Sequence, residues 1–399
     1  MLRMIRFELK KMYSNSVVIG SLAVLLLVCF LILQAYCFNN SATTTITPDG
    51  TKLSGREAIT FNQSIAEKYT GDFTDDTIAE MVSDFSIDYP TEYAEMAKNG
   101  FINSLLPSSY LYLAMFIPPA NYDEIEQDAI AHGTSIPPLT EAGLVSIRDL
   151  GTAYIDKPLQ YGYSDSWAYF FSGFCGSTIA IAFPALIVIL IAVSTIFSSE
   201  YSTKMDALIL TTRYGKNRQI IAKLFSGMIF TTTIIGGLFI LFCIAFGVQY
   251  GVLGWNADIQ TNLGLSLIGV KLPLNNLQLI IFGFIIVWLA GIFAAAATAM
   301  ISAVTKTPFS SLIVAFAVFM APLIIRQLLP ESVLRDLLIV FPANAVNAQE
   351  ALLLPVNARS IFYNQPLAPV SCIVFATIIA LFVSSVIAYK AFRNHQTLR

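Results

Sequence analysis

Six long apolar stretches dominate the pattern of hydrophobic and polar positions along the chain. None of the six contains an Asp, Glu, Lys, Arg or His residue. A helix needs about 20 apolar residues to cross the hydrocarbon core of a bilayer, so each stretch predicts a transmembrane span. The predicted spans are residues 17–38, 175–197, 225–250, 278–303, 309–325 and 368–389. The fold class is therefore predicted to be an all-α polytopic membrane protein.

The composition excludes a soluble globular protein. The chain is 56% hydrophobic and only 12% charged, whereas soluble domains carry roughly 25% charged residues. Pumps driven by protons or sodium usually keep ionisable groups at membrane depth, where those groups form the relay. Because the predicted spans have none, the energy for any transport is expected to come from outside them.

The distribution of Lys and Arg predicts the orientation of the spans. An excess of these residues marks cytoplasmic segments, and it occurs in four segments: 1–16, 198–224, 304–308 and 390–399. Both termini are therefore expected in the cytoplasm. Segments 39–174, 251–277 and 326–367 are then expected outside, and the first of them is acidic, with 19 acids and 6 bases.

The first span has two possible interpretations, a membrane anchor or a cleaved signal peptide. Its apolar core is longer than the usual 7 to 15 residues of a signal peptide. No Ala-x-Ala-like site follows it, and no small residue stands where lipoprotein cleavage before Cys37 would need one. An uncleaved anchor is the expectation.

The N-terminal segment 1–16 has an amphipathic pattern. Leu2, Ile5, Leu9 and Met12 recur at three- and four-residue steps, with basic residues on other faces. Such a helix is suited to lie in the inner headgroup layer of the membrane, with its basic side toward anionic lipid. The basic residues are Arg3, Arg6, Lys10 and Lys11. An ordinary positive-inside anchor would explain these charges but not the apolar stripe.

Residues 39–174 are predicted to form a mainly helical extracellular domain. The patterns Ser54-x-x-Glu57 and Thr77-x-x-Glu80 resemble capping boxes at helix starts. The apolar run 101–119 contains three prolines and is interpreted as domain core or as a surface on the outer leaflet. The domain is either a passive acidic cap or a platform for a cationic ligand. No metal site is expected, because His132 is the only histidine of this segment.

The cytoplasmic segment 198–224 contains a second amphipathic helix. Met205, Leu208, Ile209 and Thr212 share one helical face, and Gly215 is expected to end the helix. A short, partly apolar helix between two spans can act as a handle for another protein, because its apolar face fills a groove.

The layout of the chain resembles the permease subunits of ABC exporters, in the six-span branch with an N-terminal interfacial helix. In that family the link between spans 2 and 3 begins with a Glu, here Glu200, and forms a coupling helix. It then runs through a Gly and basic residues to a Lys that opens span 3, here Gly215, Arg218 and Lys223. Segments 50–59 and 69–76 are similar to a bacterial subset with a large outer domain.

The resemblance implies an exporter permease in a bacterial cell membrane, expected to move a hydrophobic or amphiphilic peptide, lipid or drug. Two ATPase subunits would bind ATP and Mg²⁺, and a second permease subunit, identical or paralogous, would complete the complex. Membrane lipids are further partners, and nucleic acid is not expected. Glu200, Met205, Leu208 and Ile209 would transmit force, while Arg213, Lys216 and Arg218 would meet the ATPase or lipid phosphate.

The outer loop 326–367 has four prolines that punctuate short helical stretches, predicted at 332–340 and 345–354. In the resembled family, such helices dip back between spans 5 and 6 and close the exit path. The exit-gate candidates are Pro342, Asn344, Asn347 and Glu350. The alternative is an amphipathic loop resting on the bilayer.

Motifs for chemistry within the chain are absent from the sequence. No GxxxxGK[ST] loop, HExxH, CxxC or GxSxG pattern occurs, so the chain is not expected to be an enzyme or to bind a cofactor. Cys37 and Cys175 both lie near the expected outer surface, where a disulfide is possible. Glycines such as Gly236, Gly237 and Gly291 allow close helix packing, within one bundle or at a dimer seam.

Two alternatives to an exporter permease remain at this stage. One is a receptor or assembly subunit whose outer domain senses a ligand. The other is a secondary transporter, against which the charge-free spans and the lack of two similar halves argue.

Overall fold

The computed structural model describes residues 1–46, 51–84, 131–132, 158–177, 179–211, 215 and 217–394, apart from the side chains at 46, 82–84, 209 and 263. The chain divides into two compact units. Unit 1 contains residues 1–32, 173–242 and 282–399, and unit 2 contains residues 33–172 and 243–281. The predicted run 101–119 lies outside the described residues.

Six helices of the described chain are long and apolar enough to cross a membrane, which confirms the predicted number of spans. The span helices are α2 (Ser16–Leu33, continued by a π-helical turn Gln34–Phe38), α8 (Ala182–Ser202), α10 (Arg218–Tyr250), α11 (Asn276–Val304), α12 (Pro308–Leu328) and α16 (Ala368–Asn394). The chain is therefore a multi-pass membrane protein.

The helix bounds differ most from the apolar stretches at the starts of α8 and α10. Residues 172–176 form a π-helical turn, and α8 begins only at Ala182, seven residues after the predicted start of span 2. Helix α10 begins at Arg218, seven residues before the predicted start of span 3. Hydropathy marks where apolar residues begin, whereas a helix continues as long as its polar side chains find partners. Lys223 consequently lies inside a long helix.

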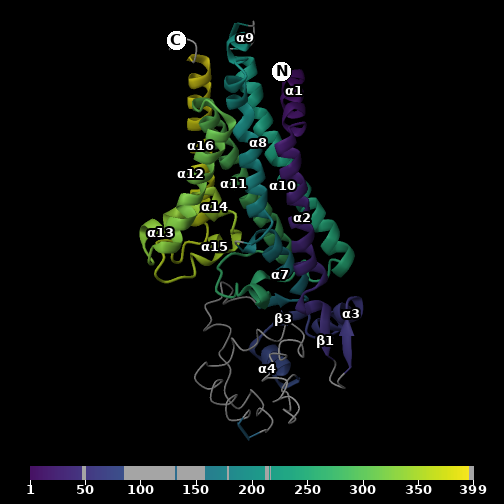
Figure 1. Cartoon of the computed structure of the whole chain (residues 1–399). Coiled ribbons are helices and arrows are strands. Elements are labelled where there is room, and N and C mark those ends of the chain that lie inside the picture. Colours follow the sequence, from purple (N-terminus) through teal and green to yellow (C-terminus); the bar gives the residue numbers. More distant parts are fainter. Residues whose placement is uncertain are drawn as a thin grey trace. The chain divides into compact units, whose positions relative to one another are not determined.

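Unit 1 is a helical bundle in which α8 packs against both α12 and the N-terminal helix α1 (Leu2–Tyr13). Ser302 of α11 joins α8, since its hydroxyl accepts from the backbone N–H groups of Phe197 and Ser198 at 3.1 Å. Within this unit, the start of α1, the end of α16 and the short helix α9 (Asp206–Thr211) lie at one end (Figure 1). Helices α13 (Val333–Leu337), α14 (Pro342–Ala345) and α15 (Ala348–Leu353) lie at the other.

A glycine allows α10 and α11 to approach closely. A Cβ atom at Gly291 would lie 2.4 Å from Ile235 Cδ1 and 2.9 Å from Thr231 Cγ2. At Gly236 and Gly237 a Cβ atom would meet nothing within 4 Å. The predicted role in packing within one bundle therefore applies to Gly291, and the surface at Gly236 and Gly237 is open.

Unit 2 contains four three-residue strands among its described residues, so it is not purely helical. Strand β1 (Thr44–Ile46) pairs antiparallel with β2 (Lys52–Ser54), and β3 (Gly71–Phe73) pairs antiparallel with β4 (Leu159–Tyr161). Its described helices include α3 (Arg56–Lys68), α4 (Asp75–Asp84) and α7 (Asp165–Phe171).

Both predicted capping boxes are wrong in detail. Ser54 ends β2, and Gly55 precedes α3 without a side-chain cap. Helix α4 begins two residues before Thr77, and the hydroxyl of Thr74 accepts from the Thr77 backbone N–H at 3.2 Å. The helices themselves are present, because the apolar spacing that predicts them does not depend on which residue caps them.

The loop 251–275 packs into unit 2 rather than standing apart as a simple connection. Asp258 accepts from the backbone N–H of Gln160 at 2.8 Å, and Trp167 donates to the carbonyl of Leu253 at 2.7 Å. Gly254 has φ 70°, and a Cβ atom there would lie 1.8 Å from the carbonyl oxygen of Tyr163. Only glycine fits this turn.

All five cysteines have free thiols. Cys37 and Cys175, the two for which a disulfide was considered, are both buried.

Candidate functional site

The most unusual feature of unit 1 is a lysine with no solvent exposure. Lys223, in the second turn of α10, has 0% exposed surface, and its Nζ atom has three acceptors. It donates to Glu200 at 2.5 Å, to Glu8 at 3.0 Å and to the backbone carbonyl of Ile196 at 3.1 Å. An ammonium group has three N–H donors, so its hydrogen-bonding capacity is filled. Burying such a charge is tolerable only because it is paired in this way.

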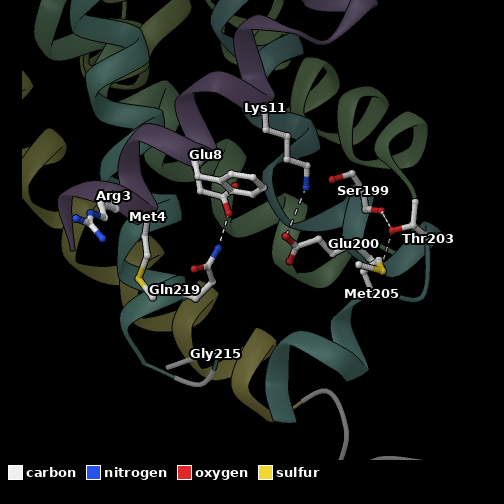
Figure 2. A pocket seen from close by; sticks show the side chains of 11 residues that line it. Arg3, Met4, Glu8, Lys11, Ser199, Glu200, Thr203, Met205, Gly215 and Gln219 are labelled. Carbon is white, nitrogen blue, oxygen red and sulfur yellow. Dashed lines mark hydrogen bonds and ion pairs between the residues drawn. The ribbon is translucent and has the colours of Figure 1, made fainter. Parts of the chain in front are cut away.

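Glu8 connects the N-terminal helix to the start of α10. One carboxylate oxygen accepts from Lys223, and the other accepts from the amide of Gln219 at 2.5 Å (Figure 2). Glu8 is 3% exposed, and it lies on the same helical face as Met12, which is also 3% exposed. The apolar stripe of α1 therefore packs partly against protein, and an acid lies within it.

Glu200, at the end of α8, receives two lysines. Its Oε1 atom accepts from Lys223 and, at 3.5 Å, from Lys11 of α1 (Figure 2). Its Oε2 atom is buried and has no hydrogen-bond partner among the described residues. We call these five side chains, Glu8, Lys11, Glu200, Gln219 and Lys223, the ion-pair cluster. With all four ionisable groups charged, the cluster is neutral, and it joins α1, α8 and α10.

A cavity of about 670 Å³ opens beside the ion-pair cluster (Figure 2). Met4 and Phe7 of α1 and Met205 give it apolar walls, while Arg3 and Lys11 add positive charge. Phe7 and Met205 are 64% and 47% exposed. Large apolar side chains exposed at the rim of a cavity are typical of a protein-binding surface.

Part of the helix predicted in segment 198–224 is present as α9, which is described as far as Thr211. Residues 212–214 lie outside the described residues, and Gly215 lines the cavity. Leu208 is 62% exposed, whereas Leu210 is buried. Arg213 and Lys216, as well as the side chain of Ile209, lie outside the described residues. Arg218 is the first residue of α10 and is exposed.

The four basic residues assigned to an interfacial helix, Arg3, Arg6, Lys10 and Lys11, are all exposed on α1. Of the apolar stripe, Leu2 is 83% exposed, Ile5 and Leu9 are half-buried and Met12 is buried. The end of α1 near Lys11 and Met12 is thus held against the bundle, and its first turn presents Leu2 outward.

The exit-gate candidates gather at the other end of unit 1. Helix α14 packs against α12, and α15 packs against α16, so the loop folds back onto the span helices. Pro342 and Asn344 are buried in α14, and Asn347 and Glu350 are half-buried around α15. Glu350 forms an ion pair with Arg326 of α12, whose exposure is 7%.

The chain matches no family model, no curated protein and no solved structure with which it was compared. The interpretation of the site therefore rests on its geometry.

Glu200 and Lys223 were predicted as site residues through the family resemblance, but their partner Glu8 was not. Its signal is visible in the sequence: Glu8 is three residues after Ile5 and four before Met12, so an acid stands within an apolar stripe. A carboxylate at that position is expected to be buried with a cation. The buried Arg326 was also missed, because it follows an apolar stretch and reads as a flanking charge.

Proposed function

We propose that this chain is the membrane-spanning subunit of an ATP-driven exporter, and that α9 and the ion-pair cluster receive force from a separate ATPase. The observation that carries the proposal is the position of the cluster. It ties the two helices that flank α9 to each other and to α1 through a buried lysine. A pull on α9 would then move the ends of α8, α10 and α1 together.

The surface beside the cluster supports a protein partner. Met205 is exposed and lines a cavity with apolar walls, and Leu208, three residues further along the chain in α9, is also exposed, as a docking helix requires. ATP and Mg²⁺ would bind the partner, since this sequence has no phosphate-binding loop. In the proposed cycle, ATP binding closes two ATPase subunits on each other, draws α9 inward and opens a path between two permease subunits.

The docking assignment is tested by replacing Leu208 with Asp and purifying the tagged chain from membranes of its own host. We expect ATP hydrolysis in the purified material to fall more than tenfold, because an interface hot spot contributes about 2 kcal/mol or more. Leu367→Asp is the matched control, since Leu367 is 62% exposed, like Leu208, and directly precedes α16, whose far end lies at the same end of unit 1 as α9 (Figure 1). Equal ATPase recovery with both variants would remove α9 from the proposed docking surface.

A second candidate function, transport driven by an ion gradient, is favoured by the buried carboxylates Glu8 and Glu200. Buried ionisable groups in membrane proteins often mark ion pathways. Proteoliposomes separate the two functions. The exporter needs ATP and its ATPase partner, whereas an ion-driven carrier works with this chain alone and an imposed pH or sodium gradient.

A further inference from the structure

A small polar cavity lies where α12, α13, α14 and α15 meet, away from the ion-pair cluster. Its volume is about 130 Å³, and Arg326, Gln327, Arg335, Asn344, Asn347 and Glu350 are among the residues that line it. Pockets for whole drug-sized ligands measure about 300–1,000 Å³. This cavity has room for a small polar group and not for a large substrate.

Two acceptors in this cavity are buried without a donor. Asn344 is 2% exposed, and its amide nitrogen donates to the carbonyl of Leu338 at 2.8 Å, which fixes the side-chain oxygen as the free acceptor. The side-chain oxygens of Asn344 and Asn347 are both buried and have no hydrogen-bond partner among the described residues. Unsatisfied buried acceptors are costly, and a ligand with N–H donors would satisfy them.

Cationic groups line the same cavity. Arg326 pairs with Glu350 and donates from Nε to the carbonyl of Arg335 at 3.0 Å, so its guanidinium is held in place. The Arg335 side chain lines the cavity as well. A guanidinium is suited to bind phosphate or carboxylate, because its donors match the spacing of the oxygens. The cavity thus offers acceptors from α14 and the start of α15, including the carboxylate of Glu350 that pairs with Arg326, and donors from α12 and α13.

We propose that this cavity binds a zwitterionic group in which a primary ammonium and an anionic phosphate lie a few bonds apart, as in phosphoethanolamine. The ammonium donates to Asn344 and Asn347, and the phosphate accepts from Arg335 and Arg326. Leu323 lines the cavity, and Ile324 and Leu328, which directly follow the lining residues Leu323 and Gln327 in α12, are 54% and 79% exposed. Acyl chains attached to the headgroup would lie along this apolar surface. The proposal is independent of ATP-driven transport.

The test is native mass spectrometry of the purified full chain, measuring the fraction that retains lipid from a mixture of three phospholipids. Phosphatidylethanolamine has the ammonium donors, phosphatidylcholine has a quaternary ammonium without N–H groups, and phosphatidylglycerol has no cation. We expect retention of phosphatidylethanolamine to exceed that of the other two about tenfold, the factor for one hydrogen bond to a charged group. Soluble phosphoethanolamine as a competitor distinguishes a lipid headgroup from a free ligand.

Substitutions in the cavity test whether the preference for phosphatidylethanolamine arises at this site. Asn347→Leu should abolish it, whereas Asn347→Asp keeps an acceptor, adds negative charge and should retain it. Asn357→Leu, at an exposed position of the same loop, is the control. If soluble phosphoethanolamine binds and the lipid is not retained, the same site takes a free zwitterion. Equal retention of the three lipids without phosphoethanolamine binding would overturn the proposal, as would a preference that survives Asn347→Leu in a folded variant.

Discussion

At the scale of single residues, Lys223 shows how the helix ends of unit 1 are held together. Its ammonium contacts one carboxylate from α1 and another from α8, and none of the three groups is more than 4% exposed. In such surroundings the desolvation cost and the Coulomb attraction are both large. The net contribution of the cluster to stability is therefore modest, while the loss of one member is severe. This asymmetry leads to a specific prediction.

Lys223→Met should lower the free energy of unfolding by about 3–5 kcal/mol, because it leaves the buried Glu8 without a cation and Glu200 with only Lys11 at 3.5 Å. The triple variant with Glu8→Gln, Glu200→Gln and Lys223→Met should recover most of this loss, since no buried charge remains uncompensated. Thermal unfolding in detergent measures both. Lys10→Met is the control on an exposed lysine and should change stability by less than about 0.5 kcal/mol. If the triple variant is no more stable than Lys223→Met alone, then Lys223 does not stabilise the protein by neutralising the carboxylates of Glu8 and Glu200.

Gly254 gives a second prediction at this scale. Gly254→Ala should destabilise unit 2 by at least about 1–3 kcal/mol, because the backbone is left-handed and the new methyl group would overlap the carbonyl of Tyr163. Limited proteolysis of the folded protein should show faster cleavage in residues 251–275. Gly251→Ala is the matched control: its φ is also positive, at 73°, but nothing lies within 4 Å. If both variants are destabilised equally, the loss of stability comes from the positive φ angle and not from the overlap with Tyr163.

At the scale of elements, the apolar stretches were sufficient to find every span helix but not where each helix begins. The apolar stretch stops at the first charge, so Lys223 lies outside the predicted span, whereas the helix itself begins at Arg218. Whether a lysine is buried depends on carboxylates that come from α1 and α8, and these meet only in the folded chain. For the same reason the sequence could nominate Glu200 and Lys223 without showing that they touch. The short strands of unit 2 were missed because three residues are too few to show the alternation of apolar and polar positions by which a strand is recognised.

The close approach of α10 and α11 gives a prediction for packing. Gly291→Leu should destabilise unit 1 by about 1–3 kcal/mol, the usual cost of overpacking, because Ile235 and Thr231 already occupy the space. Gly237→Leu faces open space and should be nearly neutral in the purified single chain. The melting temperatures of the two variants provide the comparison. A destabilised Gly237 variant and an unaffected Gly291 variant would contradict the placement of Gly291, rather than Gly237, at the close contact between α10 and α11.

At the scale of the whole molecule, six apolar helices establish a multi-pass membrane protein. The start of α1, α9 and the end of α16 share one end of unit 1, as the alternation of basic segments predicts (Figure 1). The positive-inside rule predicts that this end faces the cytoplasm. The proposed docking surface would then face the ATP supply of the cell.

Orientation can be measured with single cysteines in a background where the five native cysteines are replaced. Leu208→Cys should react with a membrane-impermeant maleimide only after the cells are permeabilised. Val333→Cys, which is 57% exposed in α13, should react in intact cells. The opposite pattern would invert the topology and exclude docking of a cytoplasmic ATPase on α9.

The exporter proposal can be tested most directly by native mass spectrometry of the complex purified with this chain from its host membranes, together with the rate at which that complex hydrolyses ATP. We expect an assembly of two permease subunits, identical or paralogous, and two ATPase subunits that hydrolyses ATP. The chain recovered alone, or with a partner that does not bind ATP, would contradict the proposal.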